Sequence, residues 1–307
     1  MKAWFALAEA RDQLALSQQT LSVFSDTEGI IRDRFEGGIE DAGRGNASQL
    51  LLSEADVATA QDTLEARREL VERTTRQLEV LAGRYPAGKA GKSARLPSFP
   101  AKTPIDLPGT LLDRRPDLAA AERRIAAADK SLLEAKRAVL PAISLTSGGG
   151  TSSNDITDLL DGNFSVWSLA GNIAQPILRG GVLRAGKARR EAERDLAAAN
   201  FEQAALTAFA EVENALAAEK YLANRVQSLT RAAQLSDDAY NRALQEYTGG
   251  TGDLLTLLTS QQTTFNRKSQ LIALRRLRLE NRVDLYLALG GSFRPSEPPP
   301  HKETTDS

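Results

Sequence analysis

The distribution of proline constrains the fold of this chain more than any other feature of the sequence. No proline occurs before Pro86 and none between Pro176 and Pro295, whereas six stand between Pro86 and Pro116. Proline removes a backbone donor and clashes with the preceding turn, so helix interiors exclude it. We therefore expect two long helical regions, separated by a connector that is rich in proline.

The proline-free stretch from Val182 to Gln245 holds one glycine, Gly186, and many residues that favour helices. A helix of that length would extend roughly 100 Å at ~1.5 Å per residue, which is typical of a coiled coil. Its apolar residues recur at mixed spacings, so a plain helical bundle stays open as an alternative. A glycine cluster at 247–252 then predicts a tight reversal, after which Asp253 can cap a second helix.

The same arrangement occurs earlier in the chain, which indicates an internal repeat. The segment 34–38 resembles 246–250, and both contain two adjacent glycines. Downstream, four residues of the first copy recur with the same spacing in the second: Leu50, Leu64, Leu78 and Gly83 against Leu257, Leu271, Leu285 and Gly290. Chance similarity between helices rich in Ala and Leu is the alternative.

Only residues 142–178 lack helical character, and there apolar residues alternate with small or polar ones. The apolar parity comprises Ile143, Leu145, Trp167, Leu169, Ile173 and Ile177. This period of two predicts a β-hairpin with one apolar face, with strands about as long as a membrane strand needs. A surface hairpin on a soluble helical protein is the alternative. An isolated hairpin is marginally stable, so we expect copies of the chain in a symmetric oligomer to complete it.

Together these features predict a mainly α fold of very long antiparallel coiled-coil helices with a short β-hairpin. We expect the parts to be a first helical hairpin at 1–83, a Pro-rich connector at 84–115, a second repeat at 116–291 with the β-hairpin at 142–178 and a long helical hairpin at 182–289, and a disordered tail at 292–307.

Composition argues against an enzyme. There is no cysteine, which excludes disulfides and thiolate chemistry, and the only histidine, His301, lies in the tail. The Gly-rich phosphate-binding motifs are absent, so we expect no catalytic residue, cofactor or metal. A formal net charge of −1 gives no reason to expect a nucleic-acid partner. The first residues do not form a signal peptide, and no apolar run is long enough for a transmembrane helix.

Several phrases carry a family resemblance. Residues 107–122 read L-P-G-T-L-L-D-R-R-P-D-L-A-A-A-E, and further matches lie at 135–145, 175–184, 209–216 and 284–291. Their order and spacing resemble the TolC-like outer-membrane efflux factors, especially the lipoprotein branch called NodT-like or OprM-like. The resemblance covers nearly the whole chain from Trp4 to Phe293.

The resemblance implies the exit duct of a tripartite efflux system of the RND type, located in the outer membrane with a periplasmic extension. The duct would be a homotrimer to which each protomer gives four strands and a set of long helices, in contact with outer-membrane lipid. A periplasmic adaptor and an inner-membrane transporter would be its partners, and drugs or other small molecules would pass through it passively.

The resemblance also implies two sites. Leu255, Thr259 and Gln262 match positions that line the periplasmic constriction, although the family commonly has an acidic residue where Thr259 stands. The glycine tips are candidates for docking the adaptor: Gly37, Gly38, Gly249 and Gly250.

Family members begin with a lipoprotein signal, an acylated cysteine, a first helix and a first strand pair. This chain starts inside the helix that follows that pair, so the resemblance implies an N-terminally incomplete copy. The alternative is a truncated, non-transporting helical coiled-coil protein that serves only interactions.

Overall fold

The computed structural model describes residues 1–36, 47–91, 94–99, 115–152, 165–177 and 179–291. It contains the helices α1 (Lys2–Glu36), α2 (Ala47–Leu81), α4 (Pro116–Arg137), α5 (Val182–Thr248) and α6 (Leu254–Ala288), and the strands β1 (Ala142–Thr151) and β2 (Ser165–Ala174). The predicted fold class, mainly helical with a short β-hairpin, is confirmed. No helix among the described residues is long and apolar enough to cross a membrane.

The chain divides into two compact units. One comprises Met1–Asp106 and Ala210–Ser307, and the other comprises Leu107–Phe209. Helix α5, with 67 residues, contributes its C-terminal part to the first unit and its N-terminal part to the second. The four-part division expected from the sequence stays a prediction.

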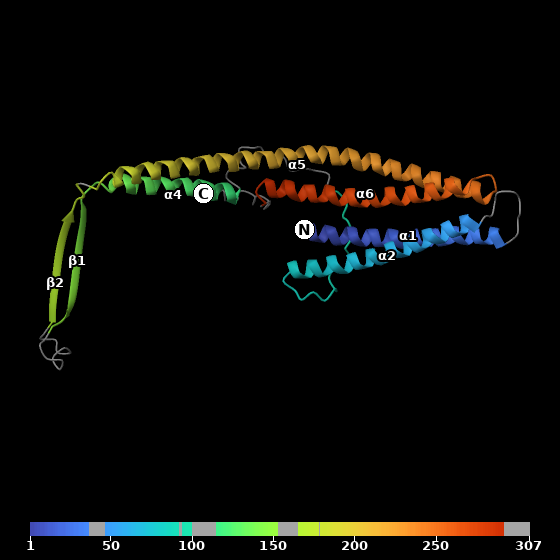
Figure 1. Cartoon of the computed structure of the whole chain (residues 1–307), viewed down its shortest axis with the longest axis horizontal. Coiled ribbons are helices and arrows are strands. Elements are labelled where there is room, and N and C mark those ends of the chain that lie inside the picture. The colour runs from blue at the N-terminus through green and yellow to red at the C-terminus, as the bar shows by residue number, and fades with distance from the viewer. Residues whose placement is uncertain (37–46, 92–93, 100–114, 153–164, 178, 292–307) are drawn as a thin grey trace, which may run out of the picture. The chain divides into compact units, whose positions relative to one another are not determined.

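In the first unit, apolar clusters tie together α1, α2, α6 and the C-terminal part of α5. One cluster joins Ile31 of α1 to Tyr247 of α5 and to Leu257 of α6, which is fully buried. Another packs Phe24 of α1 edge-on against Phe265 of α6, with the ring centroids 5.8 Å apart. Ala60 of α2 belongs to the same cluster as Phe24, and α1 and α2 lie side by side, as Figure 1 shows.

On either side of the Phe24–Phe265 pair, α1 and α6 also contact each other through polar side chains. Gln13 Nε2 donates to the backbone oxygen of Ser269 at 2.9 Å, and Ser269 Oγ donates to Gln13 Oε1 at 2.9 Å. Further along, Gln261 Nε2 donates to Thr27 Oγ1 at 3.3 Å. Because a buried polar group without a partner costs free energy, these reciprocal bonds fix the register of α1 on α6.

The helices of the first unit form a bundle, and the connector contacts this bundle at the end of α2. The buried Glu79 carboxylate accepts hydrogen bonds from the backbone N–H groups of Gly88, Lys89 and Ala90 at 2.7, 2.7 and 2.9 Å. Beyond this loop, Ala94 packs into an apolar cluster with Leu7. The carboxylate therefore holds the start of the connector against α2.

The reversal between α5 and α6 follows the sequence prediction closely. Helix α5 ends at Thr248, and Gly250 adopts a left-handed φ of 80°. Asp253 caps α6, since its side chain accepts a hydrogen bond from the Thr256 N–H at 3.1 Å. At the far end of α6, Gly290 and Gly291 take φ values of 93° and 71°. The predicted glycine tip and the predicted cap are confirmed.

In the second unit, α4 begins at Pro116, whose missing N–H costs nothing in a first helical turn. Asp117 in that turn pairs with Arg115 at 2.7 Å. The helix ends at Arg137, before Pro141 and the start of β1. Asp129 of α4 pairs with Arg194 of α5 at 3.4 Å, which ties α4 to the N-terminal part of α5.

Candidate functional site

Strands β1 and β2 form an antiparallel hairpin whose register sorts side chains onto two faces. Ile143 pairs with Ile173, Leu145 with Gly171, Ser147 with Leu169 and Gly149 with Trp167. Directly paired residues project to the same side of a sheet, and alternate residues of one strand share that side. The register therefore gathers the apolar side chains of both strands on one face, and this defines the apolar strand face: Ile143, Leu145, Trp167, Leu169 and Ile173.

The opposite face carries small or polar residues. Its pairs include Ser144 with Asn172, Thr146 with Ala170 and Gly148 with Ser168. Val166, opposite Gly150, is the one large apolar residue on this face. The two faces therefore suit two different surroundings.

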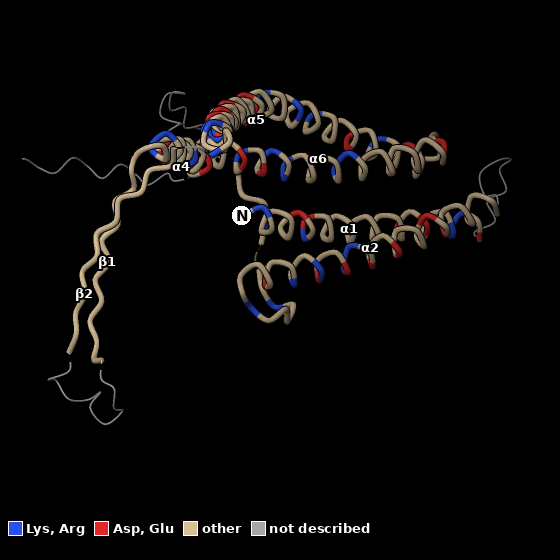
Figure 2. The backbone as a smooth tube through the Cα atoms, turned by 60° about the vertical axis from the view of Figure 1, so that its left-hand side comes forward, with Lys and Arg blue, Asp and Glu red and all other residues tan. Residues whose placement is uncertain are grey.

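None of the residues that the structure describes covers the apolar strand face. Trp167 is 83% exposed and Ile143 is 78% exposed, although such residues are usually buried. Neither strand contains Lys, Arg, Asp or Glu, whereas the helices carry many charges, as Figure 2 shows. An uncharged, apolar and exposed surface of this kind marks a site of interaction.

Ile177, which the sequence analysis assigned to the same strand, lies outside it. Strand β2 ends at Ala174, and Pro176 follows within the segment that leads to α5. Because proline has no N–H to donate to a ladder, the strand stops before it. Ile177 is 90% exposed, but it is not part of the hairpin.

The three expected constriction residues lie along α6, close to its start. Leu255 is 63% exposed, and Thr259 and Gln262 are also exposed. The hydroxyl of Thr259 donates to the backbone oxygen of Leu255 at 2.7 Å, so its polar group is satisfied within the helix. Spacings of four and three residues place all three on one helical face, opposite the buried residues Leu257 and Gln261. Their role at a constriction stays a prediction.

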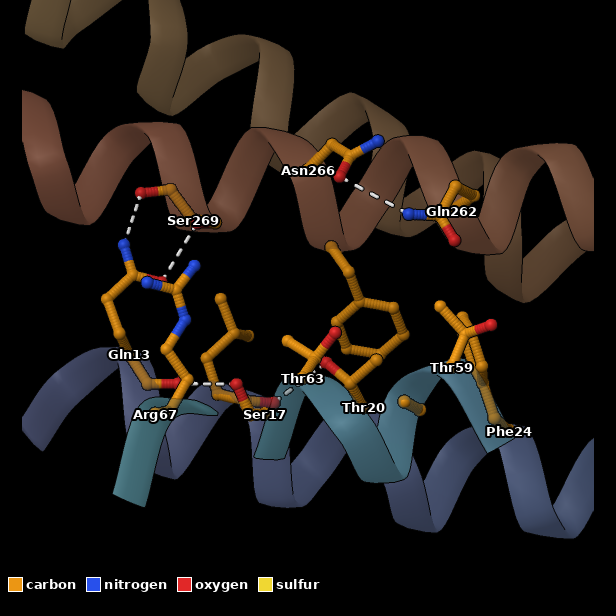
Figure 3. A pocket seen from close by; sticks show the side chains of 13 residues that line it. Gln13, Ser17, Thr20, Phe24, Thr59, Thr63, Arg67, Gln262, Asn266 and Ser269 are labelled. Atoms are coloured by element: carbon orange, nitrogen blue, oxygen red, sulfur yellow. Dashed lines mark hydrogen bonds between the residues drawn. The ribbon is translucent and has the colours of Figure 1, made fainter. Parts of the chain in front are cut away.

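Gln262 differs from the other two because it borders a cavity between α1, α2 and α6. This cavity measures about 160 Å³, and mostly polar side chains line it (Figure 3). Gln262 Nε2 donates to Asn266 Oδ1 at 3.3 Å on the α6 side. Arg67 and Thr63 face the cavity from α2. Leu255 and Thr259 do not border it.

The expected docking tips are described in part. Gly37 and Gly38 lie outside the described residues. At the second tip, Gly250 needs its left-handed φ, and a Cβ added to Gly249 would come within 3.1 Å of the Gln245 carbonyl oxygen. The tightest position is Gly252, where a Cβ would come within 2.7 Å of the Tyr247 nitrogen.

Arg34 of α1 also holds this tip, which the sequence did not reveal. Its guanidinium donates to the backbone oxygens of Tyr247 and Thr248 at 2.7 and 3.0 Å, and lies 4.2 Å from the centre of the Tyr247 ring. The last carbonyls of a helix have no intrahelical donor, so a cation there is favourable. Arg34 lies in the repeated segment 34–38, but only the tertiary packing of α1 against α5 brings its guanidinium to the end of α5.

In the part of the chain that the structure describes, no three His, Cys, Asp or Glu side chains gather where they could hold a metal ion. The expectation of no cofactor and no catalytic residue stays a prediction.

The family model for outer membrane efflux proteins matches residues 107–291, more than half of the chain. The chain belongs to this family. The match begins at the phrase around Pro116 and includes the hairpin, α5 and α6. The predicted resemblance is therefore confirmed, and the family is one of outer-membrane proteins.

Individual relatives agree with the family assignment. The chain is 31% identical over 281 residues to a probable efflux pump outer membrane protein, TtgC, of Pseudomonas putida; the match covers 91% of this chain and 57% of that protein. It is 33% identical over 306 residues to the outer membrane protein OprJ of Pseudomonas aeruginosa, covering 95% of this chain and 60% of OprJ. The chain thus spans less than two thirds of the length of these relatives.

Solved structures show the same fold. A membrane protein from Pseudomonas aeruginosa matches with a TM-score of 0.85 and 31% identity, over 94% of this chain and 66% of that one. The open state of the MtrE outer membrane channel of Neisseria gonorrhoeae matches with a TM-score of 0.82 and 27% identity, over 94% of this chain and 64% of that one.

Proposed function

We propose that this chain is the outer-membrane component of a tripartite efflux system and acts as a passive duct for drugs or other small molecules. Family membership and the similarity to TtgC, which is named as a probable efflux pump outer membrane protein, support the proposal. In such a system an inner-membrane transporter supplies the energy and a periplasmic adaptor links it to the duct. On this proposal the chain itself catalyses no reaction, and its selectivity comes from the groups that line its passage.

The two-faced hairpin is the observation that carries the proposal. One face is apolar, exposed and uncharged, while the other is small and polar. A strand between lipid and an aqueous passage needs this alternation, because each side chain then meets a matching solvent. Each strand has 10 residues, within the ~9–11 that a tilted membrane strand requires.

The hairpin also gives a reason to propose a homotrimer. It is a two-stranded sheet, so the outer edge of each strand has no pairing partner among the described residues. Free edges are not tolerated in lipid, since no water is present to satisfy their N–H and C=O groups. Copies of the chain arranged in a ring would pair these edges and close a barrel.

Within this duct we propose that Leu255, Thr259 and Gln262 line the periplasmic constriction. Their shared exposed face near the start of α6 supports this role. We also propose that the tips at Gly249 and Gly250, and at Gly37 and Gly38, dock the adaptor. We also propose the division of the chain into four parts: 1–83, 84–115, 116–291 and 292–307.

The absence of cysteine makes a site-specific test clean, because an introduced thiol is the only one present. Leu145→Cys and Thr146→Cys place a fluorescent label on opposite faces of β1. The labelled chains are recovered with the outer-membrane fraction. Quenching is then measured with a lipid-bound nitroxide and with aqueous iodide.

We expect the lipid quencher to act mainly on the label at position 145, and iodide to act mainly on the label at position 146. A label at Leu255→Cys, in the helical region, controls for general accessibility and should respond to iodide alone. Equal responses at 145 and 146, or recovery of the chain only outside the membrane fraction, would favour the interaction protein and reject the duct.

A further inference from the structure

A second cavity lies in the first unit, where α1, α6 and the connector approach one another. It measures about 720 Å³, and three arginines from three separate elements border it. Arg11 comes from α1, Arg95 from the connector and Arg275 from α6. Asp12 is the one acidic residue that borders it.

These arginines are poorly satisfied by the described part of the chain. Arg95 and Arg275 are both exposed, and each interacts electrostatically with the Asp12 carboxylate without forming a close ion pair with it. The buried Nε of Arg11 has no hydrogen-bond partner, and its Nη2 donates only a long bond of 3.4 Å to the Ala90 carbonyl oxygen. Guanidinium groups bind carboxylate, sulfonate and phosphate oxygens through paired N–H donors. Three of them facing one carboxylate leave an excess of positive charge in the cavity.

A neighbouring cavity of about 390 Å³ adds an apolar half to this site. Both cavities border Asp12, Ile272 and Arg275, so they adjoin one another. Apolar residues make up six of the ten that line this neighbouring cavity: Leu96, Pro97, Phe99, Val226, Ile272 and Leu279.

The ring of Phe99 is held in place by the charged residues behind it. The guanidinium of Arg278 lies 3.6 Å from its centre and that of Arg282 lies 4.6 Å away. Both arginines also pair with Glu219, at 2.9 and 3.6 Å. Arg278 therefore has a carboxylate partner, which it shares with Arg282, so Glu219 offsets only part of the charge of these two arginines.

We propose that the joined cavities bind an amphiphilic organic anion, with its charged group between Arg11, Arg95 and Arg275 and its apolar body against Phe99 and Ile272. Concave sites of this size that combine an apolar lining with a few convergent polar groups are typical of small-molecule sites. This inference does not depend on the duct, because it concerns a site within the helical unit.

Naphthalene-2-sulfonate is a suitable probe, since it combines a sulfonate with a flat apolar body. Its binding to the full 307-residue chain is measured by isothermal titration calorimetry at constant ionic strength. Sulfate tests the charged half alone, and 2-naphthalenemethanol tests the apolar half alone. We expect one saturable site for naphthalene-2-sulfonate, and binding at least about tenfold weaker for either half-probe.

Three variants locate the site. Arg95→Gln and Arg275→Gln should each weaken the binding of naphthalene-2-sulfonate about tenfold or more, because each removes a charged donor. Asp12→Asn should strengthen it, since the amide oxygen can still accept from the Leu96 backbone N–H while the negative charge is lost. Arg231→Gln, an exposed position on α5 away from both cavities, removes the same charge and should leave binding unchanged.

The arginine variants alter exposed side chains, so loss of folding would not confuse the result. Unchanged affinity in Arg95→Gln and Arg275→Gln would overturn the proposal, as would equal weakening by Arg231→Gln. Equal affinity for naphthalene-2-sulfonate and for either half-probe would also overturn it. The quenching test of the hairpin does not involve these residues, so the two proposals fail separately.

Discussion

The helical bundle and the β-hairpin reach stability by opposite means. In the bundle, side chains such as Leu7, Leu257 and Leu285 are fully buried by other parts of the same chain. In the hairpin every residue of both strands is exposed, including Trp167. Burial of apolar surface is the main favourable term in folding. The bundle buries its apolar side chains within the chain, whereas the apolar side chains of the hairpin stay exposed.

The residues of the bundle and those of the hairpin are therefore constrained in different ways. Bundle residues are constrained by neighbours within the chain, and a change there should alter the free energy of unfolding. On the proposed function, hairpin residues are constrained by lipid and by other copies of the chain, and a change there should alter assembly and leave the bundle intact. Four experiments test how sharp this division is.

The largest effect is expected in the bundle core. Leu257→Ala should lower the free energy of unfolding by about 2–5 kcal/mol, because it leaves a cavity in the cluster with Ile31 and Tyr247. Denaturant unfolding followed by circular dichroism measures the change. Leu255→Ala, on the opposite, exposed face of α6, and Ile143→Ala, in the hairpin, should each stay within about 0.5 kcal/mol. A large loss for Ile143→Ala would show that the hairpin supports the bundle.

Glycine replacements should also affect stability differently in the bundle and in the hairpin. At Gly252 an added Cβ meets the Tyr247 nitrogen at 2.7 Å, so Gly252→Ala should destabilise the bundle by about 1–3 kcal/mol. In the hairpin nothing lies within 4 Å of a Cβ at Gly149, so Gly149→Ala should be nearly neutral. Gly186→Ala, in the open interior of α5, should stabilise the helix by about 0.5–1 kcal/mol. Thermal melts rank the three variants, and similar losses at Gly252 and Gly149 would contradict the division.

The clamp at the tip of the bundle should contribute less. Arg34→Ala removes two hydrogen bonds to the end of α5 and a contact with the Tyr247 ring, and we expect a loss of about 1–2 kcal/mol. Arg32→Ala is the matched control, because it loses only exposed pairs with Glu28 and Glu54 and should cost less than about 1 kcal/mol. Equal losses in denaturant unfolding would show that the clamp has no special role.

The smallest effect concerns pH. Burial raises the pKa of the Glu79 carboxyl, but three backbone N–H donors and Arg76 together outweigh burial, so its pKa lies below the ordinary value of 4.5. The folded state therefore binds this proton less readily than the unfolded state, and the stabilisation is present above that value and lost as the pH falls through the lowered pKa. Glu79→Gln should flatten the acid limb of a plot of melting temperature against pH.

Glu65→Gln, at an exposed position of α2, is the control for this experiment and should leave the acid limb unchanged. Alanine replacements in β1 or β2 remove no titratable group, because neither strand has an acidic or basic side chain, so they should leave that limb unchanged. If Glu79→Gln and wild type share one pH profile, the carboxylate does not hold the connector in solution.

Local signals in the sequence were enough to predict the backbone elements. The stretches without proline contain α1, α2, α5 and α6, and Asp253 correctly marked the start of α6. The alternation of apolar residues assigned one face of the hairpin, and the register confirms it for every predicted residue except Ile177. Such features depend on neighbours within a few residues, which a sequence displays directly.

Features that depend on tertiary pairing escaped prediction. The reciprocal hydrogen bonds of Gln13 with Ser269 join residues far apart in the chain, and no sequence feature near either residue predicts its partner. The steric demand at Gly252 was missed for a related reason. It arises from the path of the backbone past Tyr247, and the left-handed φ that usually explains a glycine is found at Gly250 instead.

The strict pairing of β1 with β2 has a consequence for insertions and deletions. In a strand, one added or lost residue reverses the orientation of everything beyond it, whereas two restore it. Deletion of Ser144, for example, would make Ile143 and Leu145 consecutive and would therefore send them to opposite sides of the sheet, without replacing either side chain. Insertions or deletions of an even number of residues in a strand should therefore be tolerated far more readily than those of an odd number.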